Sequence, residues 1–280
     1  MPTRSTSLLL ALAVVAWVAP RAMLAGDREV ARVVSFGGAC ARCELSGRKL
    51  AGAQFIGANF TGAALVGSDL QGSRFLGSNF AGADLSHADL SDSAMLGANF
   101  SAAVLAGARL RGAELKGVSF LGANLSRADL GEVQATGADF TRANLYGAAL
   151  REAQLAGAIL AGADAREADF RGAALQGAVL AFGRFDNASF LNAELQQAVM
   201  TGASFAGADF RAADLSRAVI AGADLSKARG LRQEQLDAAC GDGKTRPPDK
   251  LVVRACSGIR VLVQRVPAAA APRRLVAEEP

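Results

Sequence analysis

The side chains best suited to catalysis or metal binding are few, with one histidine and four cysteines in 280 residues. Nucleophilic catalysis needs a base beside the attacking serine or cysteine, and His87 is the only histidine that could serve. Cys40 and Cys43 are spaced as in redox-active or metal-binding pairs, whereas Cys240 and Cys256 lie near the other end of the chain. Which of these chemistries is available depends on the elements that position the side chains.

Charge is balanced over most of the chain, although the formal net charge is +4. Residues 41–230 contain 17 Lys or Arg and 18 Asp or Glu, and residues 231–280 contain 9 basic and 6 acidic residues. The body therefore lacks the basic stripe of a nucleic-acid-binding protein. It also lacks a strongly acidic surface, and no residue pattern predicts a cofactor.

Residues 1–25 have the pattern of a secretory signal peptide. Arg4 supplies positive charge, an apolar run extends from Leu8 to Ala19, and small residues such as Ala25 follow. The run is shorter than the roughly 20 residues of a membrane span, so an uncleaved anchor is the less favoured alternative. We expect a periplasmic or secreted protein with no stable membrane span after cleavage.

A period of five governs residues 41–230. Every fifth residue from Leu45 to Leu225 is Leu, Phe, Met or Ile at 35 of 37 positions, and the residue two places before it is Ala, Ser, Cys or Gly at 34 of 37. Gly fills 22 of the 37 positions just before that small residue. Because this period fits neither a helix nor a strand, each pentad must form one side of a repeating coil.

The pentads resemble a known repeat. Residues 83–87 (Ala-Asp-Leu-Ser-His), 128–130 (Ala-Asp-Leu) and 143–145 (Ala-Asn-Leu) are similar to the A(D/N)LxX motif of the pentapeptide-repeat family. The resemblance covers residues 41–230 and implies an all-β fold, a right-handed quadrilateral parallel β-helix with four pentads per coil. It also implies that the small and the large residue of each pentad point inward.

A four-sided coil requires identical side chains to recur every 20 residues and to stack. One column meets this requirement with phenylalanine, and we expect it to form a core stack: Phe60, Phe80, Phe100, Phe120 and Phe140. The outward residues beside it include Asn59, Asn79 and Asn99, which we interpret as a hydrogen-bonding ladder between coils. At about 4.8 Å per coil, the coils predict a rod about 45 Å long.

The outward charged residues fit a solvated surface better than an active site. His87 falls at an outward corner. A column of carboxylates could suggest paired acids or a cation site: Asp69, Asp89, Asp129, Asp169 and Asp209. A neighbouring column is basic, however, and mixed charges of this kind usually form a solvated face: Arg111, Arg151, Arg171 and Arg211. We therefore expect no catalytic set and no metal site, and the chain is predicted not to be an enzyme.

The open ends of such a rod need caps against end-to-end aggregation. We expect an N-terminal cap over residues 26–40, including a strand within 29–36. At the other end, a C-terminal cap over 231–266 should contain a short helix over 231–239 and one or two strands over 251–266. Residues 267–280 are expected to form a disordered tail.

The rod separates the two cysteine pairs, which excludes one shared zinc site. In an exported chain we interpret the four residues as two local disulfides, Cys40 with Cys43 and Cys240 with Cys256. A redox-active pair at Cys40 and Cys43 is the alternative, but it lacks the strand-to-helix setting that lowers a thiol pKa.

One outward column departs from the polar pattern and predicts a contact surface: Ile159, Val179, Val199 and Val219. Apolar strips of this kind often mark interfaces on soluble proteins, here with an unknown protein or a second copy of the chain. Two alternatives remain open. The residues could simply suit a flat parallel sheet, or the chain's own segment 251–266 could cover them.

These observations predict a non-enzymatic exported scaffold that binds another protein through its outer faces. The family resemblance offers a second function, since some members imitate duplex DNA and bind a type II topoisomerase such as DNA gyrase in the cytoplasm. Those relatives have a strongly acidic surface and work in the cytoplasm. The neutral body and the signal-like start of this chain argue against that function.

Overall fold

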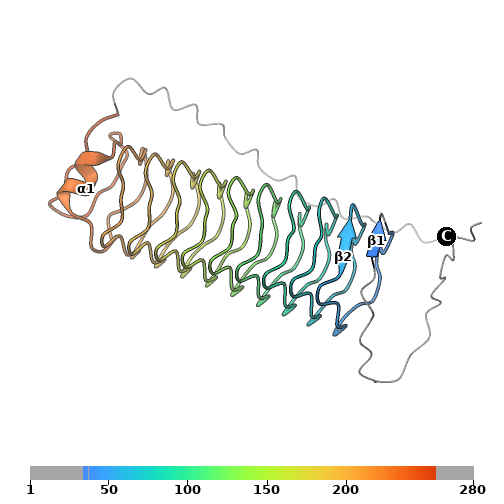
Figure 1. Ribbon diagram of the computed structural model, residues 1–280. Coiled ribbons are helices and arrows are strands. Elements are labelled where there is room, and N and C mark those ends of the chain that lie inside the picture. The colour runs from blue at the N-terminus through green and yellow to red at the C-terminus, as the bar shows by residue number, and fades with distance from the viewer. Residues whose placement is uncertain (1–33, 37, 257–280) are drawn as a thin grey trace, which may run out of the picture.

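A computed structural model describes residues 34–36 and 38–256, which form a rod of stacked coils (Figure 1). Strand β1 (Val34–Phe36) pairs in parallel with strand β2 (Gln54–Ile56) at one end of the rod, and helix α1 (Gln233–Ala238) lies at the other end. The expected signal peptide and C-terminal tail lie outside the described residues. Within the described residues, no helix has the length and apolar character needed to cross a membrane.

The coils stack in parallel with a register of 20 residues. Isolated β-bridges join the outward residue of every pentad to its equivalent 20 positions later, beginning with Ala39 and Asn59. Each bridge is supported by backbone hydrogen bonds, as in the 2.7 Å bond that the Phe60 N–H donates to the Asn79 carbonyl oxygen. Four columns of bridges therefore run along the rod, one for each pentad of a coil.

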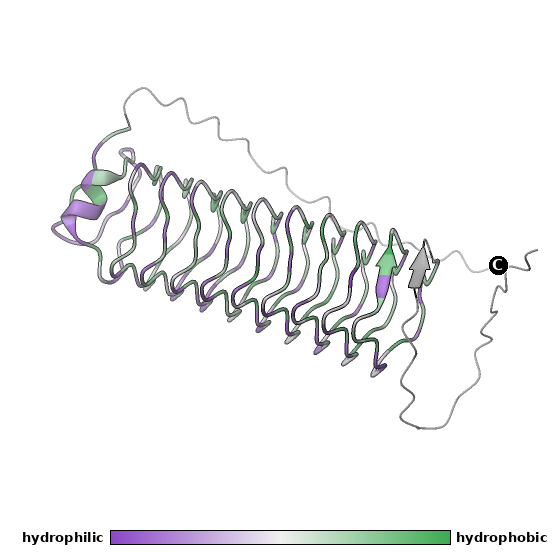
Figure 2. Cartoon of the chain, in the orientation of Figure 1, coloured by the Kyte–Doolittle hydropathy of each residue, from purple (hydrophilic) through white to green (hydrophobic). Residues whose placement is uncertain are grey.

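The pentad pattern follows from this stacking, because a side chain that points inward can only meet its own equivalents and the neighbouring sides. Every residue whose number ends in 0, 3, 5 or 8 is buried between Ala58 and Leu225. The intervening outward residues are more polar, so hydropathy alternates along each coil (Figure 2). Small residues at the third position leave room for the Leu and Phe side chains of adjacent sides to meet.

Tight turns join the pentads, and the second residue of each turn is in the left-handed region of backbone space. Glycine adopts this region without steric cost, as at Gly57 with φ of 61°. Fifteen other residues of the coils also adopt it, among them His87 and Phe182 with φ of 58° each. The turn therefore tolerates side chains, at a cost in backbone strain.

The phenylalanines stack along the rod. Ring centroids are 4.7 Å apart from Phe60 to Phe80 and from Phe80 to Phe100, 5.4 Å from Phe100 to Phe120 and 5.0 Å from Phe120 to Phe140. Beyond Phe140 this column continues with smaller side chains, and the aromatic stacks move to other sides: Phe170, Phe190 and Phe210, and Phe185 with Phe205. The core thus stays filled although the aromatic column changes sides.

Helix α1 caps the last coil. The expected helix over 231–239 is therefore present, shortened by two residues at its start and one at its end. Leu236 is fully buried against the core. The Gln235 amide donates hydrogen bonds to the carbonyl oxygens of Phe210 (2.9 Å) and Ala213 (2.8 Å). These carbonyls belong to the last full coil, so the helix covers the open core and satisfies exposed backbone acceptors.

The other predicted cap strands are described only in part. The strand expected within 29–36 is present as Val34–Phe36, and residues 29–33 lie outside the described part of the chain. At the C-terminal end, residues 251–256 form no extended strand and contain one bridge, between Ala255 and Gly241. Residues 257–266 are not described. Leu251 and Val253 pack against the core as a loop, and for the remainder of 251–266 the expected strands stay a prediction.

Candidate protein-binding surface

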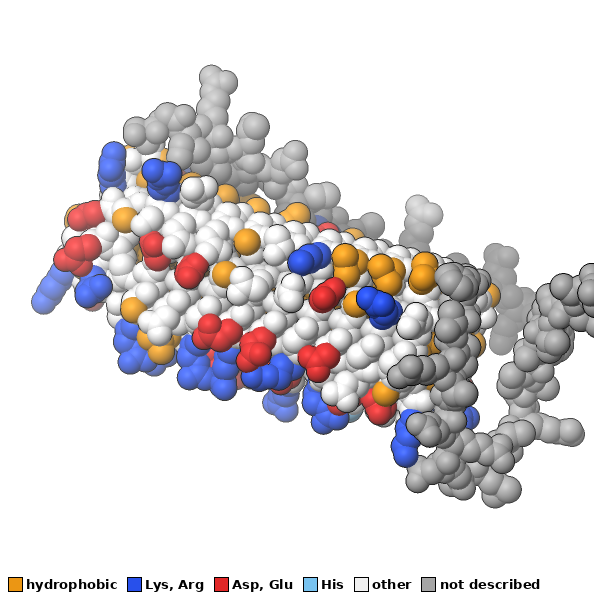
Figure 3. Space-filling model, viewed as in Figure 1, with side chains coloured by type: hydrophobic (Ala, Val, Ile, Leu, Met, Phe, Trp, Pro, Cys, Tyr) orange, Lys and Arg blue, Asp and Glu red, His pale blue; other side chains and the backbone are white. Residues whose placement is uncertain are grey.

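Two sides of the rod that are half a coil apart differ in charge. One side contains 3 charged residues among 56, namely Lys116, Asp139 and Arg142. We call it the charge-poor side and define it by eight segments, one per coil: 56–62, 76–82, 96–102, 116–122, 136–142, 156–162, 176–182 and 196–202. The charged side, ten residues further along each coil from 66–72 to 206–212, contains 17 charged residues among 56. Figure 3 shows charged side chains gathered along one edge of the rod and hydrophobic ones along the other.

Most of the exposed large hydrophobic side chains lie on the charge-poor side. Six of the eight such residues in the described chain belong to it: Ile56, Leu76, Leu96, Leu121, Ile159 and Phe182. The first three occupy the same corner in successive coils. Depletion of charge combined with exposed apolar side chains is the composition of protein interfaces. The sequence contained this signal in the charge count of each side, but only the register of 20 assigns residues to sides.

The predicted apolar strip lies in the middle of the charge-poor side. Its residues form one bridge column, in which Ile159 pairs with Val179 and Val179 with Val199. Ile159 is 38% exposed, and Val179 and Val199 are half-buried. The expectation was wrong for Val219, which is only 8% exposed because Cys240 and the C-terminal cap continue its column. Three of the four predicted residues are therefore accessible.

Phe182 was missed by the sequence analysis. It is the only Phe, Tyr or Trp at the left-handed turn position among the described residues, with φ of 58°, and its side chain is 42% exposed. A bulky residue in this region is strained, and the ring lies over Gly202, where an added Cβ would come within 2.8 Å of it. An exposed and strained aromatic side chain beside an apolar strip is a common feature of binding sites.

A column of seven glycines borders the strip on its other flank: Gly57, Gly77, Gly97, Gly117, Gly137, Gly157 and Gly177. The left-handed turn alone does not explain it, because the other three corners place Arg142, His87 or Glu132 at the same φ. A Cβ added at any of these seven glycines would meet nothing within 4 Å. The column therefore keeps a flat surface that another molecule can approach closely.

The charged side is a ladder of ion pairs. Arg211 lies 2.6 Å from Asp209, and its hydrogen bond lowers the pKa of that carboxyl. Burial pushes the pKa of Asp169 upward, but hydrogen bonds from Arg171 and Arg151 outweigh it and lower the pKa. Because three of the five predicted carboxylates, Asp89, Asp169 and Asp209, pair with arginines, this column has the mixed, solvated character that the sequence predicted.

His87 is exposed at its corner and lines a shallow hollow with Asp69, Asp89 and Arg109. Ser68 also borders the hollow, but its hydroxyl is buried and donates to the Leu65 carbonyl oxygen at 2.8 Å. Asp89 is paired with Arg109 at 3.0 Å. This arrangement provides no activated nucleophile. Within residues 34–36 and 38–256, no group of three or more potential ligands is placed to hold a metal ion.

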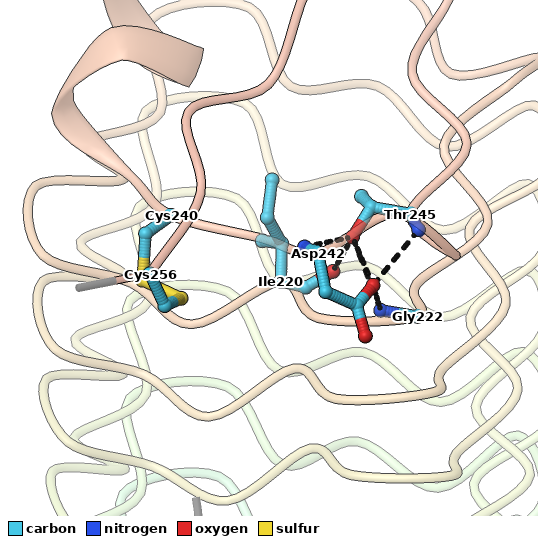
Figure 4. The surroundings of a disulfide bond; sticks show 6 residues. All are labelled: Ile220, Gly222, Cys240, Asp242, Thr245 and Cys256. Atoms are coloured by element: carbon cyan, nitrogen blue, oxygen red, sulfur yellow. Dashed lines mark hydrogen bonds between the residues drawn. A yellow bond between two sulfur atoms is a disulfide. The ribbon is translucent and has the colours of Figure 1, made fainter. Parts of the chain in front are cut away.

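The four cysteines lie at opposite ends of the rod and form two disulfides in the structure. The Cα atoms of Cys40 and Cys43 are 5.2 Å apart, and those of Cys240 and Cys256 are 4.8 Å apart. Figure 4 shows the second pair. Since Cys240 continues the bridge column of Val219, this pair lies at the end of the apolar strip.

A hydrogen-bond network beside this pair fixes the C-terminal cap on the last coil (Figure 4). Asp242 accepts from the Gly222 N–H at 2.8 Å, and the Thr245 hydroxyl donates to the Ile220 carbonyl oxygen at 3.0 Å. The network ties the cap to the coil that carries Val219. It therefore supports the end of the charge-poor side.

The geometry defines the class of the protein as a parallel β-solenoid. Its outer sides differ in charge, and the described residues contain no assembled catalytic centre. The family model for pentapeptide repeats matches eight copies, over segments that together span residues 40–229. The chain therefore belongs to the pentapeptide-repeat family, and the fold is the right-handed β-helix of that family. Among curated proteins, none matches the chain.

Several solved structures are similar to this chain. HetL, a pentapeptide repeat protein involved in heterocyst differentiation regulation in the cyanobacterium Nostoc sp. strain PCC 7120, is 29% identical, covering 70% of this chain and 90% of HetL, with a TM-score of 0.49. A trypsin-treated form of QnrB1, a plasmid-mediated fluoroquinolone resistance protein, is 21% identical over 74% of this chain and 88% of its own, with a TM-score of 0.29. A protein of the Arabidopsis thaliana thylakoid lumen is 24% identical over 65% of this chain and 80% of its own, with a TM-score of 0.12.

Proposed function

We propose that this protein is an exported, non-enzymatic scaffold, a four-sided rod that binds another protein through its charge-poor side. The observation that carries the proposal is the difference between the two sides, with 3 charged residues on one and 17 on the other. Six of the eight exposed large hydrophobic side chains lie on the side with three. A solvated rod with no binding role would gain solubility from charges on every side.

The binding side is tested by placing a photo-crosslinking amino acid at residue 179 of the protein in its native host. Val66 provides a matched control position, since it is an outward aliphatic residue at the edge of the charged side and is 37% exposed. We expect a discrete crosslinked protein from position 179 and none from position 66. Replacing Val199 with Asp should abolish that product, because burying an unpaired charge in an interface is costly. Equal crosslinking at both positions would contradict the proposal.

Export is supported by residues 1–25 and by the pairing of all four cysteines in the described structure. We expect the intact mass of the protein from its native host to lack the signal segment and to rise by about 4 Da on reduction, as two disulfides require. A full-length, fully reduced chain would contradict export. It would also favour the cytoplasmic topoisomerase function over the one proposed here.

A further inference from the structure

Beside the apolar strip lies a row of backbone donors that have no partner in the described part of the chain. In the first coils, the asparagine side chain accepts from the N–H two residues later, as Asn79 does from Ala81 at 3.0 Å. Ile and Val cannot accept. The corresponding N–H groups find no acceptor among the described residues, and they belong to Ala161, Ala181 and Thr201. These residues are only 7%, 9% and 9% exposed, so water has little access to them. Sheltered donors without partners are costly and rare.

Two side-chain atoms of the same region are also unpaired. Gln196 Oε1 and Thr201 Oγ1 are the buried side-chain polar atoms for which the described structure holds no partner. They flank Val199 in one coil, at the two corners that border the charge-poor side. Gln196 lies in the corner column that carries Leu76 in an earlier coil. The Gln196 amide nitrogen donates to the Asp214 carboxylate at 2.7 Å, so this side chain is held towards the neighbouring side of the rod, whereas the Thr201 corner carries the row of donors.

The spacing of the donor row identifies the kind of partner. Ala161, Ala181 and Thr201 occupy equivalent places in successive coils, so their N–H groups repeat at about 4.8 Å. Along an extended strand, groups on one side repeat at about 6.6 Å. A partner that meets every donor therefore needs the same coil spacing, which another stack of these coils provides.

We propose that the partner is a second copy of this chain, packed parallel to the first through the charge-poor side about a two-fold axis that runs along the rods. The inference rests on the proposed function and names its partner. Such an axis keeps each coil level with its counterpart and exchanges the two flanking corners. The corner with Gln196 then faces the corner with Thr201 of the other copy, and this arrangement occurs twice.

The same operation brings apolar groups together along the strip. Ile159, Val179 and Val199 each face themselves across the axis. Phe182 faces the glycine column of the other copy at Gly177, where an added Cβ would meet nothing within 4 Å. The flat column and the projecting ring are therefore complementary, as expected at an interface.

In the first coils, too, the two corners of the charge-poor side are complementary in side-chain size. The exposed side chains of Ile56, Leu76 and Leu96 project from one corner, and the opposite corner in the same coils holds small residues, among them Ala81. Exchange of the corners sets Leu76 of each copy on Ala81 of the other. Large side chains therefore meet small ones over three coils.

The charges near the middle of the side are compatible with this packing. Asp139 faces its own equivalent, which alone is unfavourable. Arg142 lies in the same coil at the flanking corner and therefore comes level with Asp139 of the other copy, while Lys116 lies one coil away. With two positive residues for each negative one on this side, opposite charges surround the pair of carboxylates.

The experiment measures the mass of the full mature chain by sedimentation velocity over a concentration series. We expect a dimer, and Leu76→Asp should weaken its association by at least about tenfold. Val66→Asp is the matched control, because both side chains are 37% exposed at the same pentad position and Val66 is on another side of the rod. Val179→Asp should weaken the dimer as Leu76→Asp does, although the two residues are five coils apart.

A charge exchange tests the two-fold arrangement itself. Asp139→Arg and Arg142→Asp should each weaken the dimer, and the double variant should restore it. The far-ultraviolet circular dichroism of each variant confirms that the rod is folded. A monomer at tens of micromolar would overturn the inference, as would a dimer that survives both Leu76→Asp and Val179→Asp. If the chain is monomeric but residue 179 still crosslinks another protein, the proposed function holds and the inference of a second copy fails.

Discussion

On the charge-poor side, the first coils place hydrogen-bonding side chains at the same backbone positions where the later coils place apolar ones. In the first coils Asn79 accepts from the turn N–H of Ala81 and, at 3.1 Å, from the Asn99 amide. In the last coils Val179 occupies the equivalent place and leaves the N–H of Ala181 without an acceptor in the described chain. Asn79 pairs with its own turn, whereas Val179 presents an apolar surface and leaves a sheltered N–H without an acceptor in the described chain. The comparison shows that a repeat can hold its backbone constant and still assign separate roles to its two halves.

The inner residues change at the same place. The phenylalanine stack lies directly under the asparagine ladder and ends at Phe140, and Leu160 follows it beneath Ile159. The apolar strip therefore lies on an aliphatic core column and the ladder on an aromatic one. Both halves remain closely packed, since residues of both columns are fully buried.

The largest loss of stability is expected from a substitution in the phenylalanine stack of the first coils. Phe100 is fully buried, with ring centroids 4.7 Å from Phe80 and 5.4 Å from Phe120. Phe100→Ala should lower the free energy of unfolding by about 3–5 kcal/mol, through lost burial and a cavity that stacked coils cannot close. Urea denaturation followed by circular dichroism measures the change. A loss below about 1 kcal/mol would show that the coils collapse around the gap.

The second largest loss of stability is expected from removing the disulfide at the C-terminal end of the apolar strip. Cys240→Ser together with Cys256→Ser should lower the free energy of unfolding by about 3 kcal/mol, because the bond closes a loop with a sequence separation of 16. Removing Cys40 and Cys43, whose separation is 3, should cost less, since a shorter loop loses less entropy in the unfolded chain. Thermal unfolding of the two double variants compares the ends. Equal losses would contradict this account.

Exchanging the two kinds of outward residue tests directly whether the side chain at this position pairs with the turn N–H. Asn79→Val removes an acceptor from the Ala81 N–H and should lower the free energy of unfolding by about 1–2 kcal/mol. Val179→Asn supplies an acceptor for the Ala181 N–H, so it should leave stability unchanged or raise it by about 0.5–1 kcal/mol. Urea midpoints at constant slope measure both changes. If Val179→Asn destabilises as much as Asn79→Val, the donor of Ala181 already has a partner.

The smallest effect is expected on the charged side. The pKa of Asp209 and of Asp169 is lowered by arginine neighbours. Their contribution to stability is therefore present above the unfolded pKa of about 4 and is lost as the pH falls through the lower folded values. Asp209→Asn should reduce the free energy of unfolding at pH 7 by about 0.2–1 kcal/mol and leave less to lose on acidification. Chemical denaturation between pH 7 and pH 2 tests the sign, and an unchanged acid profile would contradict it.

The amino-acid sequence was sufficient to predict the repeat and most of the buried residues. The period of five and the recurrence of Phe60 and its equivalents every 20 residues predicted which side chains are buried, because a coil with fixed register leaves each inward residue only its own equivalents as neighbours. The helix over 231–239 was predicted for a similar reason, since its residues favour helix and the open core needs a cover. Residues 1–33, 37 and 257–280 lie outside the described structure, so the signal peptide and the tail stay predictions.

The make-up of the outer sides of the rod follows from the closed and stacked coils, which the sequence pattern alone does not show. Val219 was predicted to be exposed and is buried, because the cap that covers it follows it by more than 20 residues. Phe182 and the corner of Ile56, Leu76 and Leu96 had no local signal, since an exposed side and a buried one differ only after the coils are closed and stacked. Inward positions are fixed by a repeating rule that is local in sequence. Outer surfaces depend on which distant residues share a side, and that is a property of the closed rod.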